Sequence, residues 1–463
     1  MPNKNIILFK KIFLYLVLYG ITIAMIASTF LLAPYERNDY PIFRMFIIIF
    51  ATILLVKYFI YMTVSPWYDV AIEFKKKRER SESKGAEYYP KVSVVVPAWN
   101  EEVGLLATVK TILESKYRNI EIVVINDGST DDSDKIMQDF LEVYQNEKSD
   151  KEKISIVYKY KSNGGKGKAL NHGIILSTGD IVVSIDADCI ILPDTIGNFV
   201  EHFKDPEVSA AVGNVKIGNT LHILGTLQYL EFLFSFYFKK ADSLFNTIYI
   251  IGGAAGAFRR EVFESIGLYS NKNITEDIDL SVRIQEAGLK IVYAADAIVY
   301  TEGANSLKGL SRQRLRWKQG RFQTFFEHSR LFFSTKRRHN KLLTWLILPL
   351  AVFGDTQLFF ESIFLVFLYI YSLITGDFSS FISGIIVVSS MFFVQIFDDR
   401  TVKRSTMYLI APIGWLLFYI TTVVEYQALM KSIWGVFTKQ KIVWQRWNRR
   451  GIATETVKSK YIK

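Results

Sequence analysis

The chain has 463 residues, of which 50% are hydrophobic and 15% aromatic, and its formal net charge is +11. It is too apolar for an ordinary soluble enzyme and too charged in its middle for a bundle made only of membrane helices. We therefore expect a soluble-type domain carried on membrane segments. Nucleic acid is not expected as a partner, because the sequence has no zinc-ligand spacing, recognition-helix pattern or glycine-aromatic RNA motif.

Residues 1–72 are predicted to form two N-terminal transmembrane helices. The apolar runs Ile12–Leu32 and Phe43–Val64 are each long enough to span a bilayer. Two lysines precede the first run and no small-residue cleavage site follows it, so we interpret it as an anchor rather than a signal peptide. The basic cluster KKKRER at 75–80 indicates the cytosolic side of the membrane, which places the central region in the cytosol.

Residues 90–335 are predicted to form a cytosolic α/β domain. Short runs rich in valine and isoleucine alternate there with stretches of helical period, which indicates parallel strands covered by helices on both faces. The single cysteine of the chain, Cys189, excludes an intrachain disulfide and suits a domain in the reducing cytosol. The predicted strands are Val92–Val96, Ile122–Ile125, Ile154–Val157, Ile181–Ile185 and Ala210–Val212.

One segment inside this domain, Leu221–Phe238, is apolar enough to suggest another membrane span. A single crossing there would put the carboxylates before and after it on opposite sides of the membrane. We therefore predict an amphipathic helix that lies at the membrane interface.

Residues 340–435 are predicted to form C-terminal transmembrane helices, followed by a basic tail at 436–463. The tail carries KQKIVWQRWNRR, which favours the cytosol, although three crossings would leave it outside. An extra crossing or half-crossing would remove this conflict, and we favour a cytosolic tail. The apolar segments are Leu358–Ile374, Phe378–Phe397, Met407–Met430 with a break at Pro412, and Leu342–Phe353, which is either interfacial or the start of a long tilted span.

Two motifs at predicted strand ends suit a nucleotide. In INDGSTDDS, Asp127 could accept hydrogen bonds from a base or ribose, although an Asp-Gly pair at a strand end is often a simple turn. NGGKGKALN supplies a flexible backbone and two cations, Lys166 and Lys168, that suit a diphosphate. It does not match the P-loop pattern, so its specificity is low.

A third strand end, VVSIDADC, carries Asp186 and Asp188. Two carboxylates placed two residues apart after a buried strand can hold a hard divalent cation whose other ligands are phosphate oxygens. The alternative interpretation is an acidic turn without a metal.

The motif NITEDIDL places Glu276 and Asp277 where a general base could activate an acceptor hydroxyl. The alternative is a helix start with Thr275 as N-cap and acidic residues in the first turn. Upstream, the Gly252-Gly253 turn would let a chain or ligand approach the backbone closely.

The basic stretch LSRQRLRWKQGRFQTFF, residues 310–326, is predicted to be a helix at the membrane surface. Gln313, Arg316 and Trp317 fall at i, i+3 and i+4 and therefore share one helix face. That face offers an amide, a guanidinium that can bind phosphate and an indole on which a sugar ring can stack. Three further cations, Arg312, Arg314 and Lys318, are expected elsewhere on the helix, in contact with lipid headgroups.

In their order, these motifs resemble those of the processive, membrane-embedded family 2 glycosyltransferases, which include cellulose, chitin, hyaluronan and poly-N-acetylglucosamine synthases. The resemblance covers residues 91–333 by motif and the flanking spans by layout. It implies a Rossmann-like GT-A fold, an inverting transfer and a Mg or Mn ion as cofactor.

The resemblance also implies roles for individual residues. Asp127 would bind the uridine of the donor, with Lys166 near the nucleotide, and the pair Asp186 and Asp188 would hold the metal and the UDP-sugar. The remaining candidates would serve catalysis and the acceptor. They are Asp277 as base with Glu276 beside it, and Gln313, Arg316, Trp317 and Gly253 near the diphosphate and acceptor.

Within that family, the layout and the stretches NITEDIDLS and QRLRW are most similar to the poly-β-1,6-N-acetylglucosamine synthases. This similarity implies a multi-pass protein of the plasma membrane that polymerises UDP-N-acetylglucosamine and threads the growing polysaccharide outward. The implied partners are a UDP-sugar, the polysaccharide, membrane lipid and a small membrane accessory subunit. Alternatives are another processive synthase, a transferase that adds one sugar to a lipid, and a transporter or sensor that only binds a nucleotide-sugar.

Overall fold

The computed structural model describes residues 12–13, 15–16, 19–20, 23, 41–82, 88–147, 154–220, 222–376, 378–399, 404–438 and 451–452. The chain divides into two compact units. One comprises Met1–Gly85, Leu233–Leu244 and Leu358–Thr422. The other, which we call the sheet unit, comprises Ala86–Phe232, Phe245–Gln357 and Val423–Lys463 and contains every candidate site residue predicted above.

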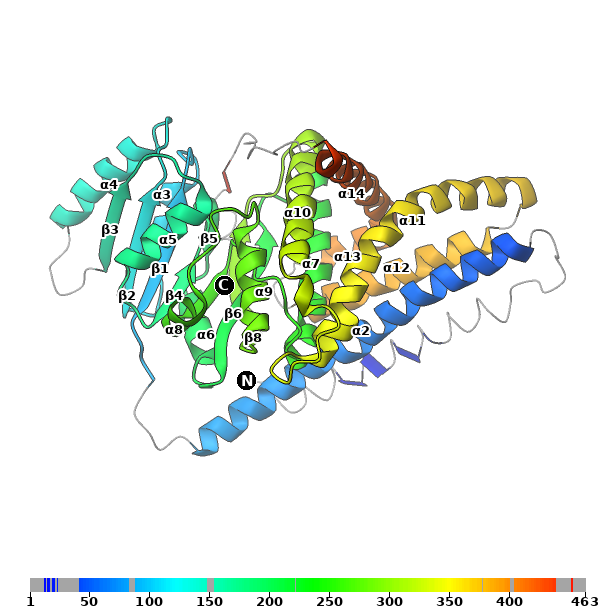
Figure 1. Cartoon of the computed structure of the whole chain (residues 1–463), viewed down its shortest axis with the longest axis horizontal. Coiled ribbons are helices and arrows are strands. Elements are labelled where there is room, and N and C mark those ends of the chain that lie inside the picture. Colours follow the sequence, from blue (N-terminus) through cyan, green and yellow to red (C-terminus); the bar gives the residue numbers. More distant parts are fainter. Residues whose placement is uncertain are drawn as a thin grey trace. The chain divides into compact units, whose positions relative to one another are not determined.

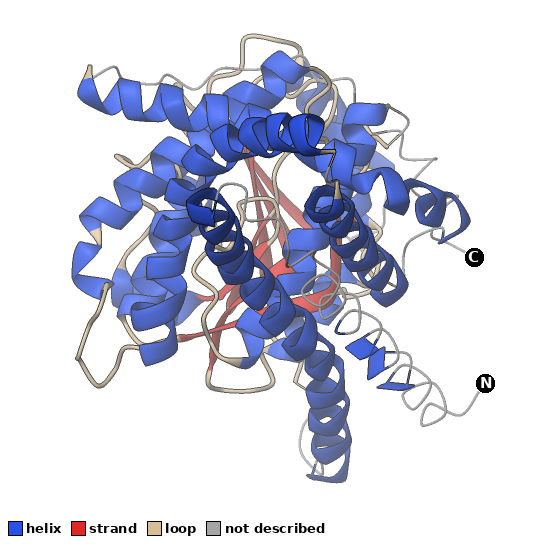
Figure 2. Ribbon diagram, turned by 90° about the vertical axis from the view of Figure 1, so that its right-hand side faces the viewer, coloured by secondary structure: helices blue, strands red, loops and turns tan. Residues whose placement is uncertain are grey.

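The described part of the sheet unit is built on one eight-stranded sheet (Figure 1), and Figure 2 shows the twist of its strands. The strands are β1 (Val92–Ala98), β2 (Ile120–Asn126), β3 (Ser155–Tyr160), β4 (Ile181–Ser184), β5 (Cys189–Ile191), β6 (Val208–Ile217), β7 (Gly256–Arg259) and β8 (Lys290–Thr301). Their order is β3-β2-β1-β4-β7-β6-β8-β5. All five predicted runs are strands.

The five predicted strands all run in the same direction, as predicted, but the sheet as a whole is mixed, because two strands that were not predicted run antiparallel. β1 pairs in parallel with β2 and β4, β2 with β3, and β6 with β8. β7 runs antiparallel to both β4 and β6, and β5 runs antiparallel to β8. β7 and β5 have four and three residues, and runs this short carry too little periodicity to be recognised in a sequence.

The parallel strands bring the predicted motifs to one edge of the sheet. Every residue of β1, β2 and β4 is buried, as expected for strands covered on both faces. Ala98 at the end of β1 lies opposite Asn126 at the end of β2, and β4 runs parallel to β1 on its other side. Asp127 and Asp186 therefore leave the sheet at the same edge, where ligands of α/β sheets commonly bind.

Helices cover the sheet and carry the remaining motifs. α5 (Lys166–Leu176) packs on β1 and β2, α6 (Thr195–His202) on β8, and α3 (Leu105–Leu113) on β5. Helix α9 (Glu276–Glu286) packs against α10 (Leu307–Glu327), the helix predicted from the basic stretch. The other helices named here are α4 (Ser133–Glu147), α7 (Ile223–Leu244) and α8 (Arg260–Ile266). The helical prediction for Leu221–Phe238 is confirmed by α7, and its place at the membrane interface stays a prediction.

The apolar segments form long helices, but only part of the predicted membrane layout is tested. Of the described residues, one helical stretch, Leu343–Glu361, is long and apolar enough to cross a membrane by length and composition. It runs from a π-helical turn (Leu343–Ile347) into α11 (Leu348–Thr375), so two predicted segments form one continuous helix. The other elements are α2 (Pro41–Glu82), α12 (Ser379–Asp398), α13 (Arg404–Ile410), a 3₁₀ turn (Ala411–Ile413) and α14 (Gly414–Phe437).

The predicted break at Pro412 is confirmed, because the 3₁₀ turn that contains this proline separates α13 from α14. Most of the first predicted span, Ile12–Leu32, lies outside the described residues, as does the basic segment of the tail at 439–450.

Candidate functional site

The first turn of α5 and the loop after β4 bring Lys166 and Asp186 together. α5 begins at Lys166 directly after Gly165, whose φ of +92° lies in the left-handed region that favours glycine. The Lys166 Nζ lies 2.6 Å from Asp186 Oδ1 and 3.7 Å from Glu276 Oε1. One ammonium group therefore joins the strand end that carries Asp186 to the start of α9.

The predicted base, Asp277, is held by backbone amides. The Gly253 N–H donates to Asp277 Oδ2 at 3.0 Å, and the Ile278 N–H donates to Oδ1 at 2.9 Å. A Cβ at Gly253 would come within 2.6 Å of the Lys166 Nζ. Glycine at this position thus allows the backbone to pass between the carboxylate and the ammonium group.

The alternative interpretation of this motif as a capped helix start is only partly met. Thr275 occupies the N-cap position of α9, with Glu276 and Asp277 in the first turn, but its side chain makes no capping hydrogen bond. The Thr275 hydroxyl donates instead to Asn273 Oδ1 at 3.2 Å. The acidic pair is therefore not accounted for by capping alone.

The charges of this cluster depend on one another. Burial disfavours the charged form of Lys166, but Asp186, Glu276 and Asp277 outweigh burial and raise its pKa. Burial raises the pKa of Glu276, and Asp277 adds to this rise, whereas Lys166 and Arg316 oppose it. The site therefore combines a lysine that keeps its charge with a glutamate that holds its proton more readily than usual.

Asp127 reaches this cluster through a loop. Its buried carboxylate forms an ion pair with Lys161 and accepts the N–H groups of Gly164 at 3.0 Å and Gly165 at 2.7 Å. The loop held in this way leads directly into Lys166. Asp127 thus fixes the start of α5, in addition to any contact with a nucleotide.

Asp186 and Asp188 offer the oxygen ligands that a divalent cation of the Mg or Mn type requires. Both side chains are partly exposed at the sheet edge, and the Thr301 hydroxyl lies 3.4 Å from Asp188 Oδ2. A Cβ at Gly104 would come within 3.1 Å of the Asp188 Cα, so the backbone beside the pair is closely packed. Two carboxylates at an open edge suit a cation that keeps free positions for phosphate oxygens.

The predicted face of α10 meets this cluster through Arg316, whose charge lowers the pKa of Glu276 against the larger effects of burial and Asp277. The Gln313 Oε1 is buried, and no hydrogen-bond donor among the described residues reaches it. The Trp317 ring lies 6.5 Å from the Phe232 ring, centroid to centroid. This face therefore presents an amide oxygen in need of a donor, a cation and an indole.

Arg314 and Lys318 were predicted to contact lipid headgroups, and the structure contradicts this prediction. The Arg314 side chain is buried and that of Lys318 is largely buried in the sheet unit, and both form ion pairs with carboxylates of other helices. The prediction failed because it assigned all cations outside the Gln313 face to the surface, whereas matched carboxylates stabilise buried charges. Contact of Arg312 with lipid stays a prediction.

The sequence did not single out three further residues of the site, Lys161, Tyr269 and Gly320. Burial raises the pKa of Tyr269, and the charges of Glu276 and Asp277 raise it further. A Cβ at Gly320 would overlap the side chain of Thr275, so α10 approaches the start of α9 as only glycine permits. A glycine inside a helical pattern was the available signal for this close contact.

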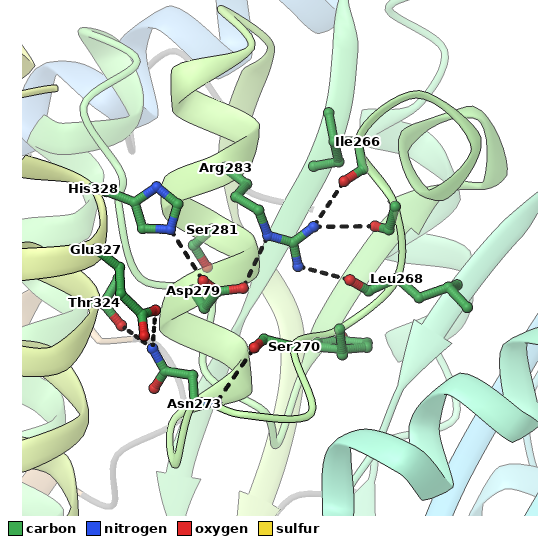
Figure 3. Close-up of polar contacts among 12 residues, drawn as sticks. Ile266, Leu268, Ser270, Asn273, Asp279, Ser281, Arg283, Thr324, Glu327 and His328 are labelled. Atoms are coloured by element: carbon green, nitrogen blue, oxygen red, sulfur yellow. Dashed lines mark hydrogen bonds and ion pairs between the residues drawn. The ribbon is translucent and has the colours of Figure 1, made fainter. Parts of the chain in front are cut away.

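A network of polar side chains holds α9 in place (Figure 3). Asp279 Oδ2 accepts a hydrogen bond from Arg283 Nε at 2.9 Å, and Arg283 also donates to the carbonyl groups of Ile266 at 2.8 Å and Leu268 at 2.7 Å. On the other side, His328 Nε2 lies 3.1 Å from Asp279 Oδ1. The network therefore links the loop before α9, α9 itself and His328, the residue that follows α10.

The ligand atoms of Asp279, Glu327 and His328 lie within 4.8 Å of one another, a spacing that could hold a metal ion. Both oxygens of Asp279 already have partners, because Arg283 and His328 contact one each. A guanidinium and an imidazole thus occupy the two oxygens of Asp279, and these contacts link α9 to the end of α10.

The comparisons with known proteins agree with this geometry. Residues 90–320 match the model of the family described as glycosyltransferase like family 2. The chain belongs to the family 2 glycosyltransferases. The expected GT-A fold is confirmed by a likeness to the solved structure of a mannosyltransferase from Pyrobaculum calidifontis in complex with GDP-Man and Mn2+. Its TM-score is 0.51 at 19% identity, over 82% of this chain and 99% of that chain. At this identity the likeness concerns the fold alone.

Among curated relatives, this glycosyltransferase is similar to proteins named poly-beta-1,6-N-acetyl-D-glucosamine synthase. One from Staphylococcus aureus (strain COL) is 30% identical over 249 residues, 53% of this chain and 57% of the relative. One from Staphylococcus epidermidis is 28% identical over 358 residues, 74% of this chain and 84% of the relative. The chain thus spans little more than half the length of the first of these relatives.

Replacing Gly253 with alanine should lower the activity of the glycosyltransferase without unfolding it. The new Cβ would displace the Lys166 ammonium group, which is the mobile end of a side chain, and would disturb its ion pair with Asp186. A displacement of about 1 Å in such a site costs up to roughly 100-fold in rate, so we expect kcat to fall about 10- to 100-fold. Gly252→Ala is the matched control, because nothing lies within 4 Å of its added Cβ. Equal kcat values for the two variants would contradict the prediction that a Cβ at Gly253 disturbs Lys166.

The His328 link should stabilise the enzyme most under mildly acidic conditions. Its hydrogen bonds to Asp279 and Glu286 raise the pKa of His328 from the ordinary 6.5, against the opposing effect of burial. A group whose pKa is raised on folding contributes its full stability below the unfolded pKa and loses it as pH rises through the folded pKa. His328→Gln should therefore lower the free energy of unfolding by about 1 to 3 kcal/mol near pH 6 and by less at alkaline pH.

Unfolding curves of the detergent-solubilised wild type and His328→Gln between pH 6 and about pH 10 test this dependence on the raised histidine pKa. His222→Gln is a control, since the side chain of that histidine is exposed. A difference between wild type and His328→Gln that stays constant across this range would contradict the prediction.

Proposed function

We propose that this chain is a membrane-bound, inverting polymerase that joins N-acetylglucosamine units from UDP-N-acetylglucosamine into poly-β-1,6-N-acetylglucosamine. The observation that carries the proposal is the cluster around Lys166. Asp277, held by the Gly253 N–H, lies in one cluster with the Lys166–Asp186 ion pair, and Arg316 of the Gln-x-x-Arg-Trp helix acts on Glu276 of the same cluster. The names of the staphylococcal relatives support this choice of sugar and linkage.

The residues of the chain suit a direct displacement at the sugar. Asp277 takes the proton of an acceptor hydroxyl, and the acceptor oxygen forms a bond to the anomeric carbon. The bond from that carbon to the diphosphate oxygen breaks on the opposite side, which inverts the configuration and releases UDP. Lys166 and Arg316 bring positive charge to the side of the cluster where the diphosphate develops negative charge.

A divalent cation fits this scheme at Asp186 and Asp188. When bound there, a Mg or Mn ion supplies positive charge to the diphosphate of the leaving UDP. The donor nucleotide is assigned to the edge of the sheet at Asp127 and its glycine loop, because Asp127 fixes the backbone that leads into Lys166 at the carboxyl ends of the parallel strands.

The acceptor is assigned to the face of α10. The buried Gln313 Oε1 suits a hydroxyl donor from a sugar, and the Trp317 indole suits the apolar face of a sugar ring. The growing chain would leave through the C-terminal membrane helices toward the outside of the plasma membrane, with lipid and a small accessory subunit as further partners. The long apolar stretch Leu343–Glu361 supports the membrane location.

A donor screen on the purified protein in lipid nanodiscs tests the proposal. UDP-N-acetylglucosamine, UDP-glucose, UDP-glucuronate and GDP-mannose are each supplied with Mg or Mn, and UDP or GDP release, product size and linkage are measured. We expect a ladder or high-mass product from UDP-N-acetylglucosamine alone, with 1,6 linkages. A product that carries a single added sugar, or polymer from a different donor, would contradict the proposed function.

A further inference from the structure

α10 carries a second functional face besides Gln313, Arg316 and Trp317. Arg314, Lys318 and Arg321 follow one another at i, i+4 and i+7 and therefore form a row along the helix. Their side chains are 5%, 12% and 21% exposed. Such burial of cations requires nearby carboxylates, because an unpaired buried charge is costly.

Carboxylates from three other helices pair with this row. Glu231 of α7 lies 2.7 Å from Arg314, and Glu425 of α14 lies 3.3 Å from Arg314 and 2.8 Å from Lys318. Asp355 of α11 lies 2.8 Å from Lys318 and also pairs with Arg321. Three cations thus meet three carboxylates, so their formal charges balance. We call these six residues the α10 charge row.

One member of the row also contacts the predicted acceptor platform. The Arg314 guanidinium carbon lies 4.4 Å from the centroid of the Trp317 ring, a cation–π contact over one face of the indole. Arg314 and Trp317 are three residues apart, so the helix itself brings them together. Glu231 and Glu425 in turn fix the guanidinium, which leaves it little freedom to move away from the ring.

We propose that Arg314 is a positioning residue that sets the orientation of Trp317 for the acceptor sugar, and that Glu231 and Glu425 hold it in place. The proposal rests on the proposed function in assigning Trp317 to the acceptor. Arg314 covers one face of the Trp317 indole, so the acceptor sugar stacks on the other face. Glu231 and Glu425, which come from helices outside the Gln-x-x-Arg-Trp motif, thereby influence how firmly the enzyme holds its acceptor. The donor cluster around Lys166 contributes no residue to the α10 charge row.

The test separates acceptor from donor binding. Arg314→Lys keeps a cation for Glu231 and Glu425 but removes the planar group that covers the indole. We expect the acceptor KM to rise about 10-fold, the size of effect that a desolvated cation–π contact supports, and the product to shorten. The donor KM and the release of UDP without acceptor should stay within about twofold, which is within the additivity error of independent sites. Arg312→Lys, on another face of α10, is the control and should change neither KM.

Two further variants distinguish a loss of the Arg314–Trp317 contact from a folding defect. Glu231→Gln weakens the hold on Arg314 but leaves the guanidinium in place, so it should shift the acceptor KM in the same direction by a smaller factor. In a Trp317→Leu enzyme, Arg314→Lys should raise the acceptor KM by less than about twofold further, because its target is gone. A residue needed only for folding would act equally with and without Trp317.

The outcomes distinguish this proposal from the proposed function. Additive effects of Arg314→Lys and Trp317→Leu, or equal changes in donor and acceptor KM, would overturn the positioning role even if the wild type makes polymer. If the wild type transfers a single sugar instead, polymerisation fails as the function. A selective, Trp317-dependent rise in the KM of that acceptor would still support Arg314 as a positioning residue.

Discussion

An Asp277→Asn enzyme is expected to bind UDP and to make no polymer. Asparagine keeps the shape of the side chain and can still accept the Gly253 N–H, but its amide cannot take a proton from the acceptor hydroxyl. Loss of a general base costs roughly 100- to 10,000-fold in rate. Polymer formation and UDP release by the purified variant measure the loss, and calorimetric titration with UDP shows that the donor site is intact.

Glu264→Gln is a suitable control for this substitution, because it removes an exposed carboxylate of α8 in the same unit. It should leave polymer formation unchanged. If Asp277→Asn made polymer at close to the wild-type rate, the base would have to be Glu276, the other carboxylate in the first turn of α9.

The second large effect is expected for Asp188→Asn. The substitution removes one of two carboxylates at the proposed metal site and leaves the Lys166–Asp186 ion pair in place. Metal stabilisation of a leaving diphosphate is worth several kcal/mol, so we expect activity to fall about 100- to 1,000-fold. We also expect the Mn concentration for half-maximal activity to rise about 10-fold, and Mn binding followed by electron paramagnetic resonance to weaken in parallel.

Asp194→Asn serves as the control for this experiment. Asp194 lies shortly after β5, and its carboxylate pairs at the exposed surface with the Lys116 ammonium group at 2.9 Å. Its loss should change neither activity nor the response to Mn. An Asp188→Asn enzyme with an unchanged Mn requirement would show that the metal, if used, binds elsewhere.

The sequence alone predicted the sheet well where strands are buried on both faces. β1, β2 and β4 are continuous runs of valine and isoleucine in which every residue is buried, so composition and burial carry the same signal. From the parallel order of such strands it also followed that Asp127 and Asp186 meet at one edge. The short strands β5 and β7 escaped prediction because three or four residues do not establish a period.

The i, i+3, i+4 spacing of Gln313, Arg316 and Trp317 predicted a shared helix face, because helical periodicity is a local property. What that face contacts was not local. Glycine is unfavourable in a helix interior, and only the structure shows what requires Gly320 there, namely the side chain of Thr275 packed against it. The close approach of two helices is decided by residues that lie far apart in the sequence.

The sequence by itself therefore determined the family, the strand ends that carry the carboxylates, and the helical register of the Gln-x-x-Arg-Trp motif. Only the tertiary structure decided that Lys161 holds Asp127 and that Arg314 and Lys318 are buried in ion pairs rather than exposed to lipid. The physical reason is the same in each case. A cation has no fixed environment of its own, and whether it lies in solvent, at lipid or in the interior depends on carboxylates that distant segments bring to it.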